Sequence, residues 1–101
     1  MPTTTKVLFR GAATTSTGTT LYTVPGATTA VVSNILIENS STSAATFTLA
    51  LNSVPIATAV SVAANSVTVI DLKQVLPATQ TITGGASTSA VDIHISGVEI
   101  S

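Results

Sequence analysis

The segment that decides the fold reads TFTLALNSVPIA and spans residues 46–57. Phe47, Leu49 and Leu51 alternate with smaller residues, which is the two-residue period of a β-strand with one face buried. Asn52-Ser53 follows as a tight-turn candidate, and the chain returns through Val54-Pro55-Ile56-Ala57. Because proline cannot donate a hydrogen bond to a sheet ladder, we expect this returning strand to lie at a sheet edge.

Outward from this hairpin, short apolar runs alternate with clusters of Gly, Pro, Asn and Ser. Further strands are predicted at 7–9, 21–24, 30–38, 67–72, 81–83 and 91–100, with 73–79 as a connector. Residues 30–38 carry apolar side chains on both faces, so this strand is expected near a sheet centre. Seven or eight such strands predict an all-β, antiparallel, jelly-roll-like β-sandwich, and a small barrel is the other arrangement of this pattern.

Two glycine-containing segments carry predictions of their own. Past Gly97 the inward-facing set changes parity, from Val91, Ile93 and Ile95 to Val98 and Ile100, so a β-bulge is predicted at Ser96-Gly97. The segment Gly84-Gly85-Ala86-Ser87 lacks the spacing and the lysine of a phosphate-binding loop, and it is interpreted as a hairpin turn.

The chain is poor in charge. Only 7% of its 101 residues are charged and the net charge is −1, against about 25% charged residues in an ordinary soluble domain. Three basic residues, Lys6, Arg10 and Lys73, are too few to neutralise a phosphate backbone, so no nucleic-acid partner is expected. No apolar run approaches the ~20 residues of a membrane helix, and no signal peptide is recognised, so neither membrane association nor export is expected. A surface with so few charges repels other copies of the chain only weakly, so we expect neighbouring subunits to cover its exposed faces.

Candidate chemistry is sparse. His94, the only histidine, shares a strand face with Asp92, but no nucleophile or metal signature accompanies the pair. We therefore expect no enzyme activity, and we interpret His94 as a solvated or interface histidine whose ring bonds to a neighbouring strand. The four acidic residues do not cluster in one loop, so no metal or other cofactor is expected. The triplet Asn39-Ser40-Ser41 matches a glycosylation site and is interpreted as a turn.

Residues 1–20 are predicted to form an N-terminal arm or first strand followed by a Thr-rich connector, and residues 21–101 to form the sandwich domain. Lys6 and Arg10 flank Val7-Leu8-Phe9, and these five residues are the candidate interface, as an arm that adds a strand to another subunit. An ordinary first strand of the same sandwich explains them equally well. Deleting residues 2–11 would leave a folded domain in the first case and an unfolded one in the second.

Several strings resemble small virion proteins of tailed bacteriophages: LYTVP at 21–25, IDLKQVL at 70–76, GGAS at 84–87 and HISGVEI at 94–100. The resemblance, which extends to cyanophage capsid cement proteins, implies a decoration or cement subunit on the capsid surface, made in the host cytoplasm. It would bind and stabilise the shell of major capsid protein and associate with itself as a homodimer or homotrimer.

Other functions stay open. A tail, collar or fibre component would share the same composition. A carbohydrate-binding or adhesive β-sandwich module would use the hydroxyl-rich faces, although only three aromatic residues are present to stack on sugars. Threonine abundance also suggests ice binding, against which the irregular threonine spacing argues.

Overall fold

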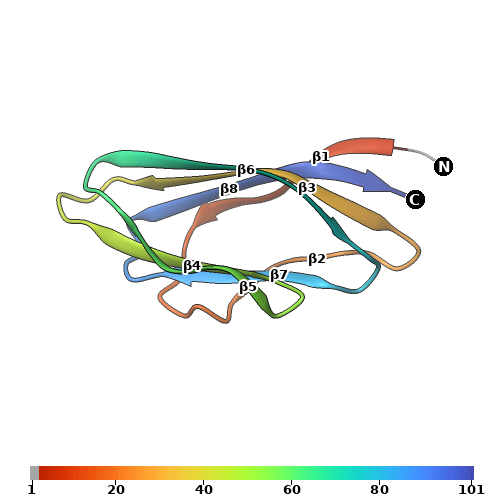
Figure 1. Ribbon diagram of the computed structural model, residues 1–101, viewed down its shortest axis with the longest axis horizontal. Helices are drawn as coiled ribbons and strands as arrows, with labels where there is room; N and C mark the ends of the chain where they lie inside the picture. Colours follow the sequence, from red (N-terminus) through yellow and green to blue (C-terminus); the bar gives the residue numbers. More distant parts are fainter. Residues whose placement is uncertain (1–2) are drawn as a thin grey trace.

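The structure is a computed structural model that describes residues 3–101. Its described part is built from strands, which form two antiparallel sheets packed face to face (Figure 1). The strands are β1 (Thr3–Ala12), β2 (Thr20–Thr23), β3 (Thr29–Asn39), β4 (Ala45–Leu51), β5 (Val54–Val62), β6 (Ser66–Leu76), β7 (Thr81–Ala86) and β8 (Val91–Ile100). The predicted all-β sandwich is confirmed.

The strand order is that of a jelly roll. Sheet A has the order β1-β8-β3-β6, and sheet B has the order β2-β7-β4-β5. The chain thus passes repeatedly between the sheets, and two Greek keys interlock. β3 lies between β8 and β6, as its two apolar faces predicted, and β5 lies at the edge of sheet B, as Pro55 predicted. The Asn52-Ser53 turn is also confirmed, with both residues at positive φ, which is the geometry that a two-residue hairpin favours.

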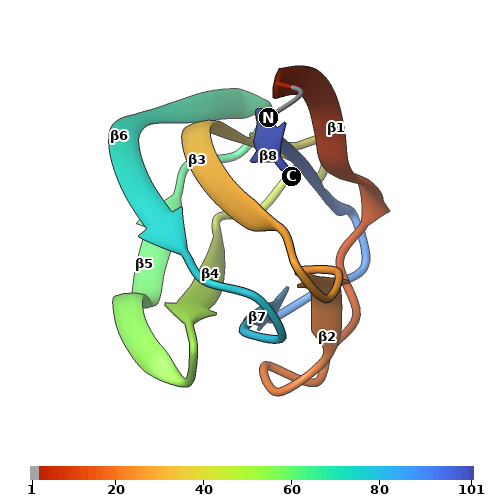
Figure 2. The ribbon, with the colours of Figure 1, turned by 90° about the vertical axis from the view of Figure 1, so that its right-hand side faces the viewer.

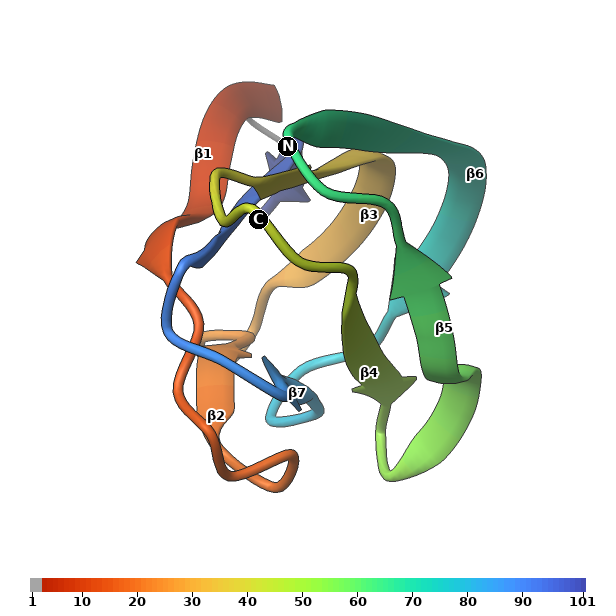
Figure 3. The same cartoon turned by 90° about the vertical axis from the view of Figure 1, so that its left-hand side faces the viewer.

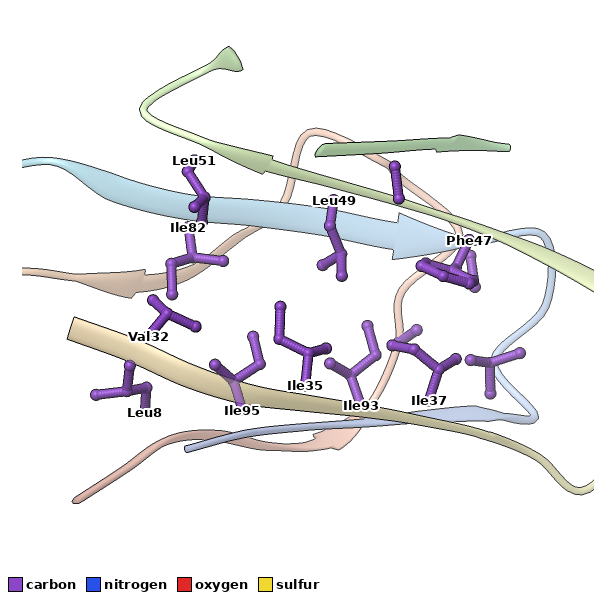
Figure 4. Packing of buried hydrophobic residues seen from close by; sticks show 14 of the residues in the cluster. Leu8, Val32, Ile35, Ile37, Phe47, Leu49, Leu51, Ile82, Ile93 and Ile95 are labelled. Carbon is purple, nitrogen blue, oxygen red and sulfur yellow. The ribbon is translucent and has the colours of Figure 1, made fainter. Parts of the chain in front are cut away.

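The core fills the space between the sheets (Figure 4). Sheet A contributes isoleucines from β3 and β8, and sheet B contributes the predicted inward set of β4 together with Ile82. The largest fully buried side chains include Phe47, Leu49, Ile35, Ile93 and Ile95. Alternation along each strand therefore places β-branched residues where they pack best against a pleated surface.

The bulge predicted at Ser96-Gly97 is wrong in position. β8 keeps its alternation through this point, and the extra residues lie in both of its neighbours, Leu8 in β1 and Ser33 in β3. Gly97 is buried in this alternation, and the position requires glycine because a Cβ there would lie 2.2 Å from the carbonyl oxygen of Val31. The glycine therefore accommodates a close approach between strands, and it does not mark an insertion.

Two further boundaries differ from the predictions. Gly84-Gly85 lies inside β7 and forms no turn, because both residues pair with β4. Both must be glycine, since a Cβ on Gly84 would lie 2.5 Å from Thr48 O and one on Gly85 would lie 2.3 Å from Ser16 O. The connector predicted at 73–79 begins later, since β6 continues to Leu76 by pairing with β3. In both places the neighbouring backbone decides the boundary.

Asn39 is a buried polar anchor at the end of β3, with 0% of its surface exposed. Its amide Nδ2 donates to the carbonyl oxygens of Ser43 (2.9 Å), Val62 (3.2 Å) and Ala63 (3.3 Å). Its Oδ1 accepts from Ser41, from the backbone N at 3.0 Å and from Oγ at 2.8 Å. The residue thus ties sheet A to the end of β5 in sheet B, which goes beyond the turn that was predicted for the triplet.

Candidate interaction surface

Exposed apolar side chains gather on two edge strands. Among residues 3–101, seven large hydrophobic side chains are exposed, and six of them lie on β5 and β6. We call this set the apolar flank: Val54, Ile56, Val60, Val67, Val69 and Val75. Both strands border the same side of the sandwich, with β1 and β2 on the opposite side (Figures 2 and 3).

The flank arises from the pattern of β6. Val67 and Val69 point outward with 54% and 53% of their surface exposed, and Val75 is 61% exposed. The residues between them, Thr68 and Ile70, are half buried on the inner side. An antiparallel sheet with one face in water normally presents polar residues on that face, and the outward row of valines on β6 departs from this pattern.

Both strands of the flank also present open backbone edges. β5 and β6 each have one strand neighbour, and β6 runs for 11 residues. An edge of this length with apolar side chains is a template for another strand unless it is covered or blunted. β5 is blunted by Pro55 and by two register shifts, whereas β6 carries only Asp71 and Lys73 as charged residues.

The five residues of the predicted interface lie on β1, where they do not form one surface. Leu8 is 6% exposed and belongs to the core, and Phe9 packs partly buried against that core. Val7 is 44% exposed, and Lys6 and Arg10 are exposed as well. Residues 3–12 pair with β8, so the described part of the predicted arm is a strand of sheet A, while its Pro2 lies outside the described residues. An interface role for the exposed members stays a prediction.

Lys6, Glu99 and Tyr22 connect the two sheets at one end of the sandwich. Lys6 Nζ lies 3.2 Å from Glu99 Oε2, and the Tyr22 hydroxyl of sheet B donates a hydrogen bond to the same carboxylate oxygen. Burial and the neighbouring Glu99 carboxylate raise the pKa of Tyr22 above its ordinary range. The hydrogen bond from Tyr22, assisted by Lys6, lowers the pKa of Glu99.

These pKa shifts predict how stability depends on pH. Since the folded-state pKa of Glu99 is lowered, Glu99 contributes to the stability of the fold above its unfolded pKa of about 4.3, and this contribution is lost as the pH falls. Since the pKa of Tyr22 is raised, its contribution is present below about 10 and is lost at higher pH. Tyr22→Phe should therefore cost about 1 kcal/mol between about pH 5 and 9, and less outside that range.

Urea unfolding of both proteins at pH 3, 7 and 11 measures this difference. Thr23→Val, an exposed change on the same strand, is the control and should show no such pH profile. A constant difference between the Tyr22→Phe variant and the unmodified chain across all three pH values would contradict the assigned roles of Tyr22 and Glu99.

The outer face of sheet A carries His94 and Asp92, the pair that the sequence places on one strand face. Arg10 Nε donates to His94 Nδ1 at 3.2 Å, so the interpretation of His94 as bonded to a neighbouring strand is confirmed. Asp92 lies directly opposite Glu38 on β3, two acidic residues side by side. Within residues 3–101, no group of three or more His, Cys, Asp and Glu side chains is placed to hold a metal ion.

Two open hollows meet at Ser33 on this face, where the strand register shifts. One has a cavity volume of about 420 Å³ and the other of about 490 Å³. Their lining residues are Thr5, Lys6, Val7, Ser96, Gly97 and Val98 for the first, and Asp71, Leu72 and Lys73 for the second. The first hollow is lined by a mixture of hydroxyl-bearing, valine, glycine and lysine residues, which is no recognisable arrangement of nucleophile and base.

The part of the chain that the structure describes has no helix of the length and apolar character that a membrane span requires. No family model and no curated protein matches the sequence.

Among solved structures, the chain is similar to two crystal structures of pentameric capsid proteins isolated from metagenomic phage sequences. The first is 19% identical with a TM-score of 0.43, and the second is 21% identical with a TM-score of 0.34. Each alignment covers 94% of this chain, and the chain spans about three fifths of those proteins, 59% and 60%.

Proposed function

We propose that the chain is a structural subunit of a bacteriophage particle, of the capsid decoration or cement type. Its work would be mechanical: the subunit binds neighbouring copies of the major capsid protein on the outside of the shell and holds them together, and no covalent bond is made or broken. Partners would be that shell and further copies of the chain itself.

The observation that carries this proposal is the apolar flank. Six exposed valine and isoleucine side chains lie on two edge strands at one side of the sandwich, where they are costly to leave in water and where a neighbouring subunit would cover them. The surface has few charges to keep copies apart, since the whole chain has seven charged residues, three basic and four acidic.

Two further features support the same role. The jelly-roll order of the two sheets is common in viral capsid domains, and lectins and cupins also use it, so the fold alone does not decide the function. The sequence strings that resemble phage virion proteins favour the capsid among these. A sugar-binding role is less well supported, because Phe47 is buried and Phe9 and Tyr22 are half buried.

The test is re-addition of the purified chain to phage shells that lack it. The unmodified chain should bind with a saturating copy number in the hundreds per particle, measured by quantitative mass spectrometry of sedimented shells. A few copies per particle would place the protein in the tail, collar or fibre, and no binding would contradict a virion role.

A pair of isosteric variants tests the surface. Val67→Thr on the apolar flank should weaken shell binding about tenfold, because it puts a hydroxyl into a covered apolar contact. Val7→Thr on the opposite side should leave binding unchanged. The reverse result would assign binding to β1 and the predicted arm.

A further inference from the structure

The exposed edge of sheet A has a self-complementary sequence. Along β6, residues 69–75 read VIDLKQV, and their outward-facing members are Val69, Asp71, Lys73 and Val75. The two charges stand at the middle of the series and the two valines stand at its ends. If an antiparallel copy of the same strand lay alongside, each valine would therefore lie opposite a valine, and each charged residue would lie opposite a residue of the other sign.

The charges on this edge lack partners within the chain. Among residues 3–101 the ion pair is Lys6 with Glu99, and neither Asp71 nor Lys73 takes part in one. Both side chains are exposed. These two charges have opposite signs and lie two residues apart on one face. Asp71 of one copy could therefore pair with Lys73 of a second, antiparallel copy.

From these observations we propose that two copies of the chain pair through β6 about a two-fold axis at Leu72. This register places Asp71 of each copy opposite Lys73 of the other, and Val69 opposite Val75. Directly opposite cross-strand neighbours of this kind stabilise an antiparallel pair. The contact is isologous and closes on itself as a dimer.

Neighbouring registers are disfavoured by the same charges. Moving the axis one residue toward the start of β6 places Asp71 opposite its own copy, and moving it one residue the other way does the same with Lys73. Like charges directly opposite each other destabilise the pair. Among these three registers, the one centred on Leu72 satisfies both the charges and the valines.

The irregularity in β6 does not interrupt the outward row. Leu72 and Lys73 together oppose the single Ser33 of β3, yet every odd-numbered residue from Val67 to Val75 is exposed, and Gln74 is the one even-numbered residue between them that is exposed too. With outer faces continuous, the two sheets A join into one sheet of eight strands, and both sheets B lie on the same side of it. Each β5 then faces the other across the axis, so Ile56 and Val60 of the flank are brought toward the contact.

This inference rests on the proposed role as an assembly subunit, and it names a second copy of the chain as the partner at β6. Strand addition at an open edge supplies backbone hydrogen bonds, and the alternating side chains supply the register. The aggregation hazard of a long open edge is thereby removed.

Charge exchange tests the register with the full chain. The unmodified protein should sediment as a dimer at about 0.1 mM, whereas Asp71→Lys and Lys73→Asp should each weaken self-association about tenfold or more, since each replaces two attractions by two repulsions. Mixing the two single variants should restore a 1:1 dimer, because all charges are then complementary. The double exchange Asp71→Lys/Lys73→Asp should dimerise like the unmodified protein.

Cysteine substitution tests the axis, since the chain has no cysteine of its own. Leu72→Cys should oxidise to a disulfide-linked dimer, because residues on the axis are directly opposite in an antiparallel pair. Val67→Cys, at the far end of the strand, should remain reduced. A monomeric unmodified chain, or a mixture of charge variants no more dimeric than its components, would overturn the proposal.

The two proposals fail in distinguishable ways. A chain that is monomeric in solution and on shells, yet binds shells in hundreds of copies, contradicts the β6 contact and leaves the cement role standing. A dimer that responds to the charge exchange but binds no shell supports the β6 contact and contradicts the cement role.

Discussion

Asn39→Asp is expected to lower the free energy of unfolding by about 4 kcal/mol at pH 7, within the range for an uncompensated buried charge. Asn39 is fully buried, and its amide donates to three backbone carbonyl oxygens within 3.3 Å. A carboxylate would remove both donors and bring a negative charge against the same three oxygens. Small domains are stable by only ~5–15 kcal/mol, so this loss would be a large fraction of the total. A loss of this size should lower the melting temperature of the variant by about 20 °C.

The pH dependence identifies the cause. In the variant the carboxyl would have a pKa raised in the folded state by burial, so its stability is greatest below the unfolded value of about 3.9 and falls as the pH rises. Thermal melts at pH 4 and 7 should therefore show a smaller deficit at pH 4. Asn65→Asp, at an exposed turn, is the matched control and should change stability by less than about 1 kcal/mol. An equal, small loss in both variants would contradict the anchoring role of Asn39.

Leu8→Ala is expected to destabilise the isolated chain by about 3 kcal/mol, the cost of a cavity in a packed core. Leu8 is the extra residue of the β1 irregularity, and it is 6% exposed among the core side chains. The neighbouring Val7 is 44% exposed, so Val7→Ala should change stability by less than about 0.5 kcal/mol. Chemical denaturation of the two variants makes the comparison.

The same comparison decides between the two interpretations of residues 2–11. A first strand of the sandwich requires that deleting them unfolds the domain, because β8 would lose a neighbour along its whole length. An arm that functions only on another subunit requires a folded deletion product and a neutral Leu8→Ala. On the described pairing of β1 with β8 we expect the first outcome.

Much of the fold could be predicted from local patterns. The alternation of Phe47, Leu49 and Leu51 sufficed to orient β4, and Pro55 sufficed to place β5 at an edge. The errors occur where a residue's role depends on a strand distant in sequence. Gly97 is required by the carbonyl of Val31, and Gly85 by that of Ser16, and neither approach leaves a mark in the local sequence.

The candidate surface was less predictable for a related reason. The predicted interface rests on two charges that flank an apolar run, but Leu8 of that run belongs to the buried core. The apolar flank could have been found from β6, where Val67 and Val69 alternate with Thr68 and Ile70 so that both faces are partly apolar. What the sequence does not contain is that β5 and β6 end up on the same side of the sandwich.

The jelly-roll order also sets the sequence of events in folding. β7 and β8 come last among these eight strands in chain order, yet each is inserted between two earlier ones, β7 between β2 and β4 and β8 between β1 and β3. Until they emerge, β1 and β2 have no strand partner in their own sheets, whereas β3 with β6 and β4 with β5 can already pair. During synthesis the chain would thus be only partly paired, with the valines of β6 exposed, and the insertion of β7 into sheet B and of β8 into sheet A would complete the two sheets. Such long-range pairing is slow, so the rate of that last insertion determines how long the chain is exposed to aggregation.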